Sequence, residues 1–153
     1  MAETRKGTLK DRIVREMTID TEGVLDRSFD KAKGIFLLDK NGKVVILSKE
    51  LMNTDEKVLT YLIGKKYAVF AGYAEFDDAG TSELVNDLGI PKGTLDPAIN
   101  NLKKKKRIVV SRKDGRKLLH KIADNFIEPM ILQICKKFEK NPTNTSSKKK
   151  VKR

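Results

Sequence analysis

Residues 81–102, TSELVNDLGIPKGTLDPAINNL, predict two short helices joined by a tight turn. Thr81 or Ser82 can cap the first helix, and Gly89 can end it because glycine tolerates the left-handed backbone of a helix C-terminus. Apolar residues occupy one face of each helix: Leu84, Val85 and Leu88 in the first, and Leu95, Ala98, Ile99 and Leu102 in the second. We therefore expect the two helices to cross over the turn, with the second presented outward.

A basic stretch follows and ends in a predicted β-hairpin. Residues 103–107 are KKKKR, and residues 108–111 form a β-branched run that is typical of a strand. The sequence KDGR at 113–116 predicts a turn with Asp-Gly at its centre, after which residues 117–120 can return as a second strand.

This order of helix, turn, helix and basic hairpin resembles the winged helix-turn-helix superfamily, especially its small archaeal and bacterial regulators. The resemblance covers about residues 54–120 and is carried by SELVNDLGIPKGTL, NNLKKKKRIVV and RKDGRK. It implies that residues 95–105 enter the DNA major groove and that the hairpin at 108–120, the wing, touches backbone or minor groove. The expected fold is α+β, mostly α, with an N-terminal β-hairpin extension and a long C-terminal helix.

The candidate contact residues lie on the predicted second helix and the wing. Positions opposite the apolar face point outward, and these are Gly93, Pro97, Asn100 and Lys104. Asn100 is a candidate adenine reader, because its amide can meet N6 and N7 together. The full set of candidate DNA-binding residues is Lys92, Thr94, Asn100, Asn101, Lys103, Lys104, Lys105, Arg107, Ser111, Arg112, Lys113, Arg116 and Lys117.

The same helix also carries features that limit base recognition. Gly93 and Pro97 offer no side-chain hydrogen bond, and no arginine precedes Arg107 to contact guanine. Because proline is tolerated in the first turn of a helix, we expect Thr94 to be the N-cap and residues 91–93 to belong to the turn. We therefore expect the protein to bind DNA with modest sequence specificity and with most of its affinity directed at the DNA backbone.

The charge distribution points to the same class of partner. The chain has 153 residues and a net charge of +12. Residues 92–121 contain eleven Lys or Arg and two acidic residues, for a net +9, and residues 139–153 contribute +5, whereas residues 1–91 carry −2. Segregated positive charge is typical of proteins that bind polyanions, so double-stranded DNA is the expected partner.

Composition and motifs exclude several classes of protein. One cysteine and one histidine cannot form a disulfide framework or a Cys/His metal site. Composition alone leaves an all-carboxylate Mg²⁺ or Ca²⁺ site open, but we expect no metal and no cofactor. No apolar run reaches the roughly 18 residues of a membrane helix, and residues 1–17 lack a secretory h-region. We therefore expect no membrane partner and a cytoplasmic or nucleoid-associated location, nuclear in a eukaryote.

We also expect no enzyme. The phosphate-loop, dinucleotide-binding, GxSxG and HExxH motifs are absent from the sequence. The Asp77-Asp78 pair is typical of an ordinary turn. A nuclease-like carboxylate site assembled in space is the one enzymatic alternative left open.

The N-terminal half is expected to contain three elements. Thr8 can cap a short helix with Leu9, Ile13 and Met17 on one face, and residues 18–34 are interpreted as loop. Residues 35–47 predict a β-hairpin around Asn-Gly with strands that are apolar on both faces. A helix is expected from about residue 55, and residues 67–76 either extend it or form a strand.

Apolar residues recur from Leu119 to Phe138 and predict a C-terminal helix that Pro129 kinks or restarts. We expect part of this stripe to form a homodimer interface; the alternative is packing on the hairpin at 35–47. Cys135 is interpreted as a buried hydrophobe and His120 as structural or a minor phosphate contact. The expected division is 1–53 as N-terminal extension, 54–138 as winged-helix domain and 139–153 as disordered basic tail.

The sequence thus favours a DNA-binding protein, either a transcriptional regulator or a chromatin-type binder. One alternative is a protein-interaction winged-helix subunit of a larger transcription or chromosome-organising assembly, with residues 35–47 as its docking edge. A second alternative is an RNA- or ribosome-associated protein.

Overall fold

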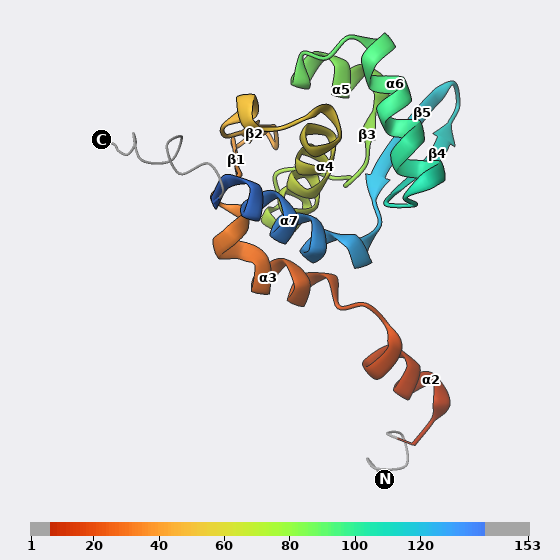
Figure 1. Cartoon of the computed structure of the whole chain (residues 1–153). Coiled ribbons are helices and arrows are strands. Elements are labelled where there is room, and N and C mark those ends of the chain that lie inside the picture. The colour runs from red at the N-terminus through yellow and green to blue at the C-terminus, as the bar shows by residue number, and fades with distance from the viewer. Residues whose placement is uncertain (1–6, 140–153) are drawn as a thin grey trace.

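The computed structural model describes residues 7–139 and has a mixed α and β fold in which helices predominate over a small antiparallel sheet (Figure 1). The α-helices are α2 (Leu9–Arg12), α3 (Thr21–Ala32), α4 (Thr54–Ala71), α5 (Thr81–Leu88), α6 (Lys92–Asn100) and α7 (Ile127–Glu139). The strands are β1 (Phe36–Leu38), β2 (Val44–Ile46), β3 (Ala79–Gly80), β4 (Val109–Asp114) and β5 (Lys117–Ile122). π-Helical turns at Ile13–Met17 and Asn101–Lys105 follow α2 and α6, and 3-10 turns at Lys49–Leu51 and Asp124–Phe126 precede α4 and α7.

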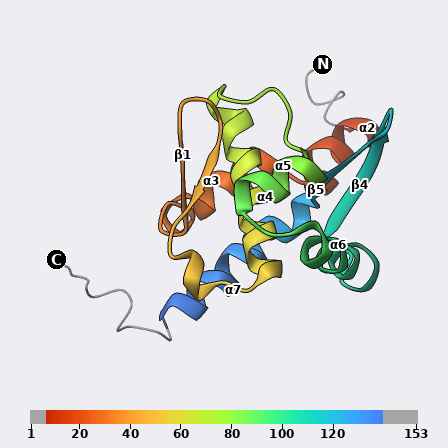
Figure 2. The same ribbon diagram turned by 90° about the horizontal axis from the view of Figure 1, so that it is seen from above.

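The core is built around α4, which lies between the other elements in both views (Figures 1 and 2). The helix begins with a capping box, in which the side chains of Asn53 and Glu56 each accept a hydrogen bond from the other's backbone N–H at 2.9 Å. It ends at Gly72, whose φ of 82° is left-handed. Residues 67–71 therefore continue the helix, and residues 58–64 are buried without interruption.

The predicted hairpin at 35–47 is confirmed, and it covers one side of α4. Phe36, Val44 and Ile46 are buried against that helix, whereas Leu37 and Val45 on the opposite face are 52% and 44% exposed. The strands approach α4 closely at Gly64, where an added Cβ would lie 2.6 Å from both γ-carbons of Val44. Only a residue without a side chain allows this distance.

The remaining strands belong to a second sheet beside α5 and α6. Strand β5 pairs antiparallel with both β3 and β4, which gives the order β3-β5-β4. The predicted pair of helices is confirmed, with Gly89 at a φ of 68° ending α5. The buried side chains of the two helices and their turn are Leu84, Leu88, Ile90, Leu95 and Ile99, and Leu102 is buried in the π-helical turn after α6.

The interpretation of residues 18–34 as loop is wrong, because residues 21–32 form helix α3. Asp20 caps this helix by accepting a hydrogen bond from the Gly23 N–H at 3.1 Å. Its buried stripe contains only Leu25, Ser28 and Ala32, which pack towards α7. Such a short and partly polar stripe carries little hydrophobic periodicity, and the signal was therefore missed.

The expected N-cap at Thr94 is also wrong. Helix α6 begins at Lys92 with Pro91 as its N-cap, because the Pro91 carbonyl accepts from the backbone N–H groups of Thr94 and Leu95 at 3.0 and 2.9 Å. Pro97 consequently lies inside the helix rather than in its first turn. The helix thus has a full turn before Pro97.

The C-terminal helix begins at Ile127, later than the sequence pattern indicated, because residues 117–122 form β5. Pro129 then falls in the first turn, where its missing N–H costs no intrahelical bond, and the expected break after Ile127 is absent from the described helix. The buried residues Ile127, Ile131 and Ile134 pack towards α3 and α4. The apolar stripe that suggested a dimer interface therefore has partners within the chain.

One buried core joins the segments on both sides of residue 53, from Leu25 to Ile134. The expected basic tail at 139–153 lies, apart from Glu139, outside the described residues.

A buried ammonium group connects three parts of the fold. Lys66 Nζ lies 2.7 Å from Asp77 and 2.6 Å from Asp124, and Thr21 donates to Asp124 at 2.7 Å. Burial lowers the pKa of Lys66, but the two carboxylates outweigh it and raise the pKa overall. Burial raises the pKa of Asp124, but Lys66 and Thr21 lower it overall. Lys66 and Asp124 therefore stay ionised at neutral pH.

We expect Gly64→Ala to lower the free energy of unfolding by about 1–2 kcal/mol, because overlap with Val44 outweighs the better helix propensity of alanine. Urea unfolding followed by circular dichroism measures the change. Gly93→Ala is the matched control, since nothing lies within 4 Å of its added Cβ, and it should be neutral or stabilising. Equal midpoints for the two variants would contradict the close contact.

We expect Asp124→Asn to destabilise the fold by about 1–2 kcal/mol at pH 7, less than for a fully buried pair because this carboxylate is partly exposed. A carboxylate with a lowered folded-state pKa stabilises the fold above its unfolded pKa of about 3.9, and this stabilisation is lost as the pH falls. The difference between wild type and variant should therefore shrink below about pH 4. Urea unfolding at several pH values measures it; a constant difference would contradict the ion pair.

Candidate nucleic-acid interface

Helix α6 presents one buried and one exposed face. Leu95 and Ile99 point into the core, and Leu102 continues this face into the following π-helical turn. The four positions expected to point outward, Gly93, Pro97, Asn100 and Lys104, are all exposed. The candidate helix is thus held by its apolar side, and its outer side is open to a partner.

The π-helical turn Asn101–Lys105 extends the helix with consecutive lysines. Lys104 and Lys105 are exposed and Lys103 is partly exposed, and positive charge at this end is favourable because the helix C-terminus is partially negative. Arg107 then turns the chain with a left-handed φ of 58°, and the Ile108 N–H donates to the Leu102 carbonyl at 2.8 Å. This turn places the lysines next to the start of β4.

Strands β4 and β5 form the hairpin that the sequence predicted. The register runs from Val109 opposite Ile122 to Asp114 opposite Lys117. The two-residue connection is Gly115-Arg116, with Gly115 at a φ of 65°, so the turn is centred one residue later than expected. Lys113, Arg116 and Lys117 are exposed around this tip.

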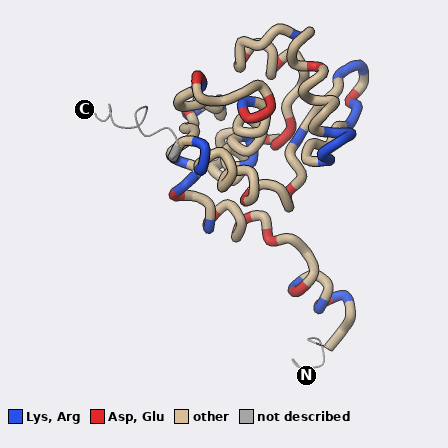
Figure 3. The backbone as a smooth tube through the Cα atoms, in the orientation of Figure 1, with Lys and Arg blue, Asp and Glu red and all other residues tan. Residues whose placement is uncertain are grey.

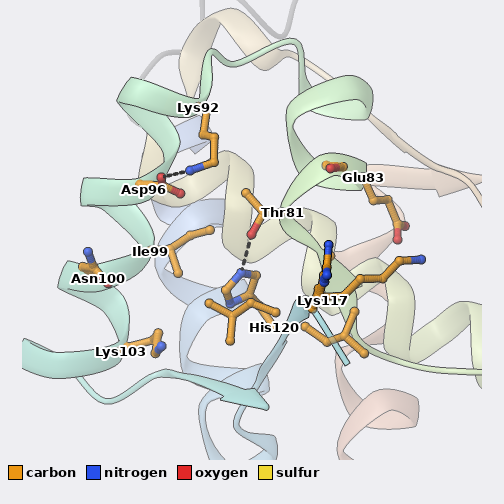
Figure 4. Close-up of a pocket in the computed structure, with 14 residues that line it drawn as sticks. Thr81, Glu83, Lys92, Asp96, Ile99, Asn100, Lys103, Lys117 and His120 are labelled. Atoms are coloured by element: carbon orange, nitrogen blue, oxygen red, sulfur yellow. Dashed lines mark hydrogen bonds and ion pairs between the residues drawn. The ribbon is translucent and has the colours of Figure 1, made fainter. Parts of the chain in front are cut away.

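A groove of about 640 Å³ separates α6 from β5 and the start of α5 (Figure 4). Lys92, Asn100 and Lys103 line one side, and Lys117 lies on the other. This is the space between the candidate reading helix and the hairpin.

His120 lies at the inner end of this groove and is 1% exposed. Its Nε2 lies 3.0 Å from Thr81 Oγ1 and its Nδ1 lies 2.7 Å from Ser111 Oγ. Burial, together with the nearby charge of Lys103, lowers the pKa of His120, so the ring is neutral at pH 7. Its contacts tie α5 to the base of the hairpin, which favours the structural interpretation of this residue.

Several of the candidate residues have partners within the protein. Arg112 contacts Asp78 through Nε at 3.0 Å and a terminal nitrogen at 2.9 Å, and Lys92 contacts Asp96 at 2.7 Å. The Asn101 amide points towards Asp55 at 3.4 Å, and the Ser111 hydroxyl is engaged by His120. These groups must give up or share an internal contact before they can reach a ligand.

Seven other candidate cations have no ion pair within residues 7–139. They are Lys103, Lys104, Lys105 and Arg107 at the end of α6 and Lys113, Arg116 and Lys117 at the hairpin tip. Figure 3 shows Lys and Arg gathered on these two neighbouring elements, on one side of the molecule. The helix and hairpin cations, which belong to one basic block of the sequence, therefore also lie on one side of the molecule.

The position of α5 depends on a contact that the sequence analysis missed. The Tyr61 hydroxyl lies 2.5 Å from Glu83 and 2.6 Å from Asp87, one helical turn apart on α5, and Lys65 contacts Glu83 at 3.1 Å. Burial and the two carboxylates raise the pKa of Tyr61, so it remains a neutral donor. The i, i+4 spacing of the two acids was a visible signal, but their partner is more than twenty residues away.

No metal or membrane element is found in the described part of the chain. Residues 7–139 contain no group of three His, Cys, Asp or Glu side chains placed to hold a metal ion. Asp77 and Asp78, the acidic pair in the turn, are engaged by Lys66 and Arg112. Within the same residues, no helix has the length and apolar character needed to cross a bilayer.

Comparisons with known proteins give no match to a family model, a curated protein or a solved structure.

Proposed function

We propose that this protein binds double-stranded DNA as a winged helix-turn-helix protein. In this proposal α6 and its π-helical turn enter the major groove, and the β4–β5 hairpin is the wing on the backbone. The observation that carries the proposal is the cluster of seven cations on these two neighbouring elements, none of which has an ion pair with a residue in the described range 7–139. A phosphodiester backbone is the partner whose charge and length suit such a cluster.

The order of elements supports the fold assignment. Helices α5 and α6 cross over a short turn with a left-handed glycine, and a basic hairpin follows directly. The apolar face of α6 is buried and its polar face is open, as a helix that enters a groove requires.

The exposed face of α6 supports modest sequence specificity. Asn100 is the outward residue with an amide that can recognise adenine, whereas Gly93 and Pro97 present no hydrogen-bonding side chain. The neighbouring lysines contact phosphates without reading sequence. Strong phosphate contact with weak base recognition suits a transcriptional regulator with a degenerate site, or a chromatin-type binder in the nucleoid or nucleus.

We expect binding to duplex DNA to weaken with salt, with log K falling against log salt at a slope of roughly −5 if about six phosphates are neutralised. Lys104→Ala should weaken binding to all sequences and reduce the slope by about one. Fluorescence anisotropy with labelled duplexes at several salt concentrations measures both quantities.

Lys40→Ala is the control for this titration, because Lys40 is an exposed lysine in the β1–β2 turn, away from the cluster. If Lys40→Ala and Lys104→Ala weakened binding equally, the cation cluster would not be the binding surface. The same titration with RNA and single-stranded DNA distinguishes the proposed function from the RNA-associated alternative, which predicts tighter binding to RNA than to duplex DNA. A protein partner retained after nuclease treatment would favour the assembly alternative.

We expect Asn100→Ala to flatten the sequence preference at one adenine position and to leave the salt slope unchanged, because the amide contacts a base and carries no charge. Selection from a randomised duplex pool measures the preference. Asn86→Ala, an exposed asparagine on α5, serves as control. A preference that survives Asn100→Ala would show that this residue does not read the sequence.

A further inference from the structure

The N-terminal helical segment, residues 9–17, leaves its apolar face uncovered by the rest of the described chain. Leu9 is 70% exposed, Val14 61% and Met17 78%, and Ile13 is 40% exposed. The segment has a proper helix start, since Thr8 Oγ1 accepts from the Asp11 N–H at 3.1 Å. A single helix of this length is marginal in water, so it needs a surface to pack on.

The chain leading from this segment into α3 directs it away from the body of the protein (Figure 1). Thr18 has extended backbone angles, φ −95° and ψ 135°, and the Asp20 side chain is committed to the cap of α3. Only three residues, 18–20, connect the two helices. The segment therefore stands out as an arm in this arrangement.

An apolar groove lies along α3, on the side facing β1 and α4. Two adjoining hollows share Phe29 and Tyr67, and the apolar one is walled by Phe36, Leu37 and Leu38. Phe29 and Leu37 are 51% and 52% exposed. Large apolar side chains gathered in this way on a surface mark an interaction site.

The arm and the groove match in size, and the arm has a small net positive charge where the second hollow is acidic. Nine helical residues span about 13 Å, which fits beside α3 with its twelve residues and length of about 18 Å. The second hollow is bordered by the acidic residues Asp20, Glu22 and Asp26. The arm carries Lys10, Arg12 and Arg15 against Asp11 and Glu16, and the two arginines also contact Glu16.

We propose that the arm of one copy packs into the α3 groove of a second copy, and that the reverse contact closes a two-fold dimer. Arm and groove are present on every chain, so a reciprocal exchange covers both surfaces at once. The extended connection at residues 18–20 carries the arm away from its own groove, which favours a second copy as the occupant. This interface differs from the one expected at the C-terminal helix, and it does not depend on DNA binding.

The first test is the mass of the protein in solution, measured by light scattering over a range of concentrations. Wild type should approach twice 17.3 kDa. Ile13→Asp and Phe29→Asp should each weaken self-association at least about tenfold, because each places a charge in the buried contact. Both positions are exposed in the single chain, and circular dichroism confirms that the variants fold.

Leu132→Asp is the matched control, because Leu132 is an exposed apolar residue on α7, 41% accessible. It should leave the dimer intact. A monomeric wild type at about 100 µM, or a dimer that only Leu132→Asp disrupts, would overturn the proposal.

A second test identifies the occupant of the groove by disulfide formation in a Cys135→Ser background. Ile13→Cys chains mixed with Phe29→Cys chains should form a cross-linked pair of twice the chain mass. In the control, chains carrying Asp11→Cys are used in place of chains carrying Ile13→Cys. Asp11 lies outside the apolar face of the arm, so the cross-linked pair should not form. The absence of a cross-link on mixing would overturn the proposal. A disulfide formed within one chain that carries both substitutions would also overturn it, and would show that the chain's own arm occupies the groove.

Discussion

The burial of α4 is the constraint on which the rest of this structure depends. This helix is covered on most of its circumference. The hairpin, the flanking helices and the α5–α6 pair that pack on it are therefore held at fixed positions. Gly64 sets the distance to β2, Tyr61 holds α5 through its two carboxylates, and Lys66 fixes the segments that lead into β3 and α7. The outward direction of α6 follows from this central packing.

The same arrangement explains why the cations on α6 and the hairpin remain unpaired. Within the described residues, three acidic side chains near them are already engaged: Asp78 with Arg112, Asp96 with Lys92, and Asp55 with Lys106 and Asn101. These contacts fix the backbone of both elements without neutralising their outer surfaces. The acid on the hairpin itself, Asp114, is exposed. The remaining positive charges repel one another, and a polyanion relieves this repulsion.

The sequence predicted the elements whose signals are local. Gly89 marked the turn between α5 and α6, the Asn-Gly pair marked the first hairpin, and the apolar spacing of α6 identified its outer face. Helix α3 was missed because its buried stripe is short and includes Ser28, and the start of α7 was misplaced because Leu119 and Ile122 belong to a strand. The partners of Arg112, Ser111 and Asn101 could not be predicted, since those contacts join segments separated in the chain by nine to forty-six residues.

The hydroxyl contacts of His120 bear on how the hairpin can move. This ring joins the base of the hairpin to α5, and the Arg112–Asp78 pair holds the middle of β4, whereas the side chains of Lys113, Arg116 and Lys117 at the far end are exposed. Within residues 7–139, the hairpin is thus fixed at its base, where its side chains bond to α5 and to Asp78, and not at its tip. In the proposed DNA complex, this anchored base would hold the hairpin at a constant angle to α6, with the exposed cations of its tip facing the duplex.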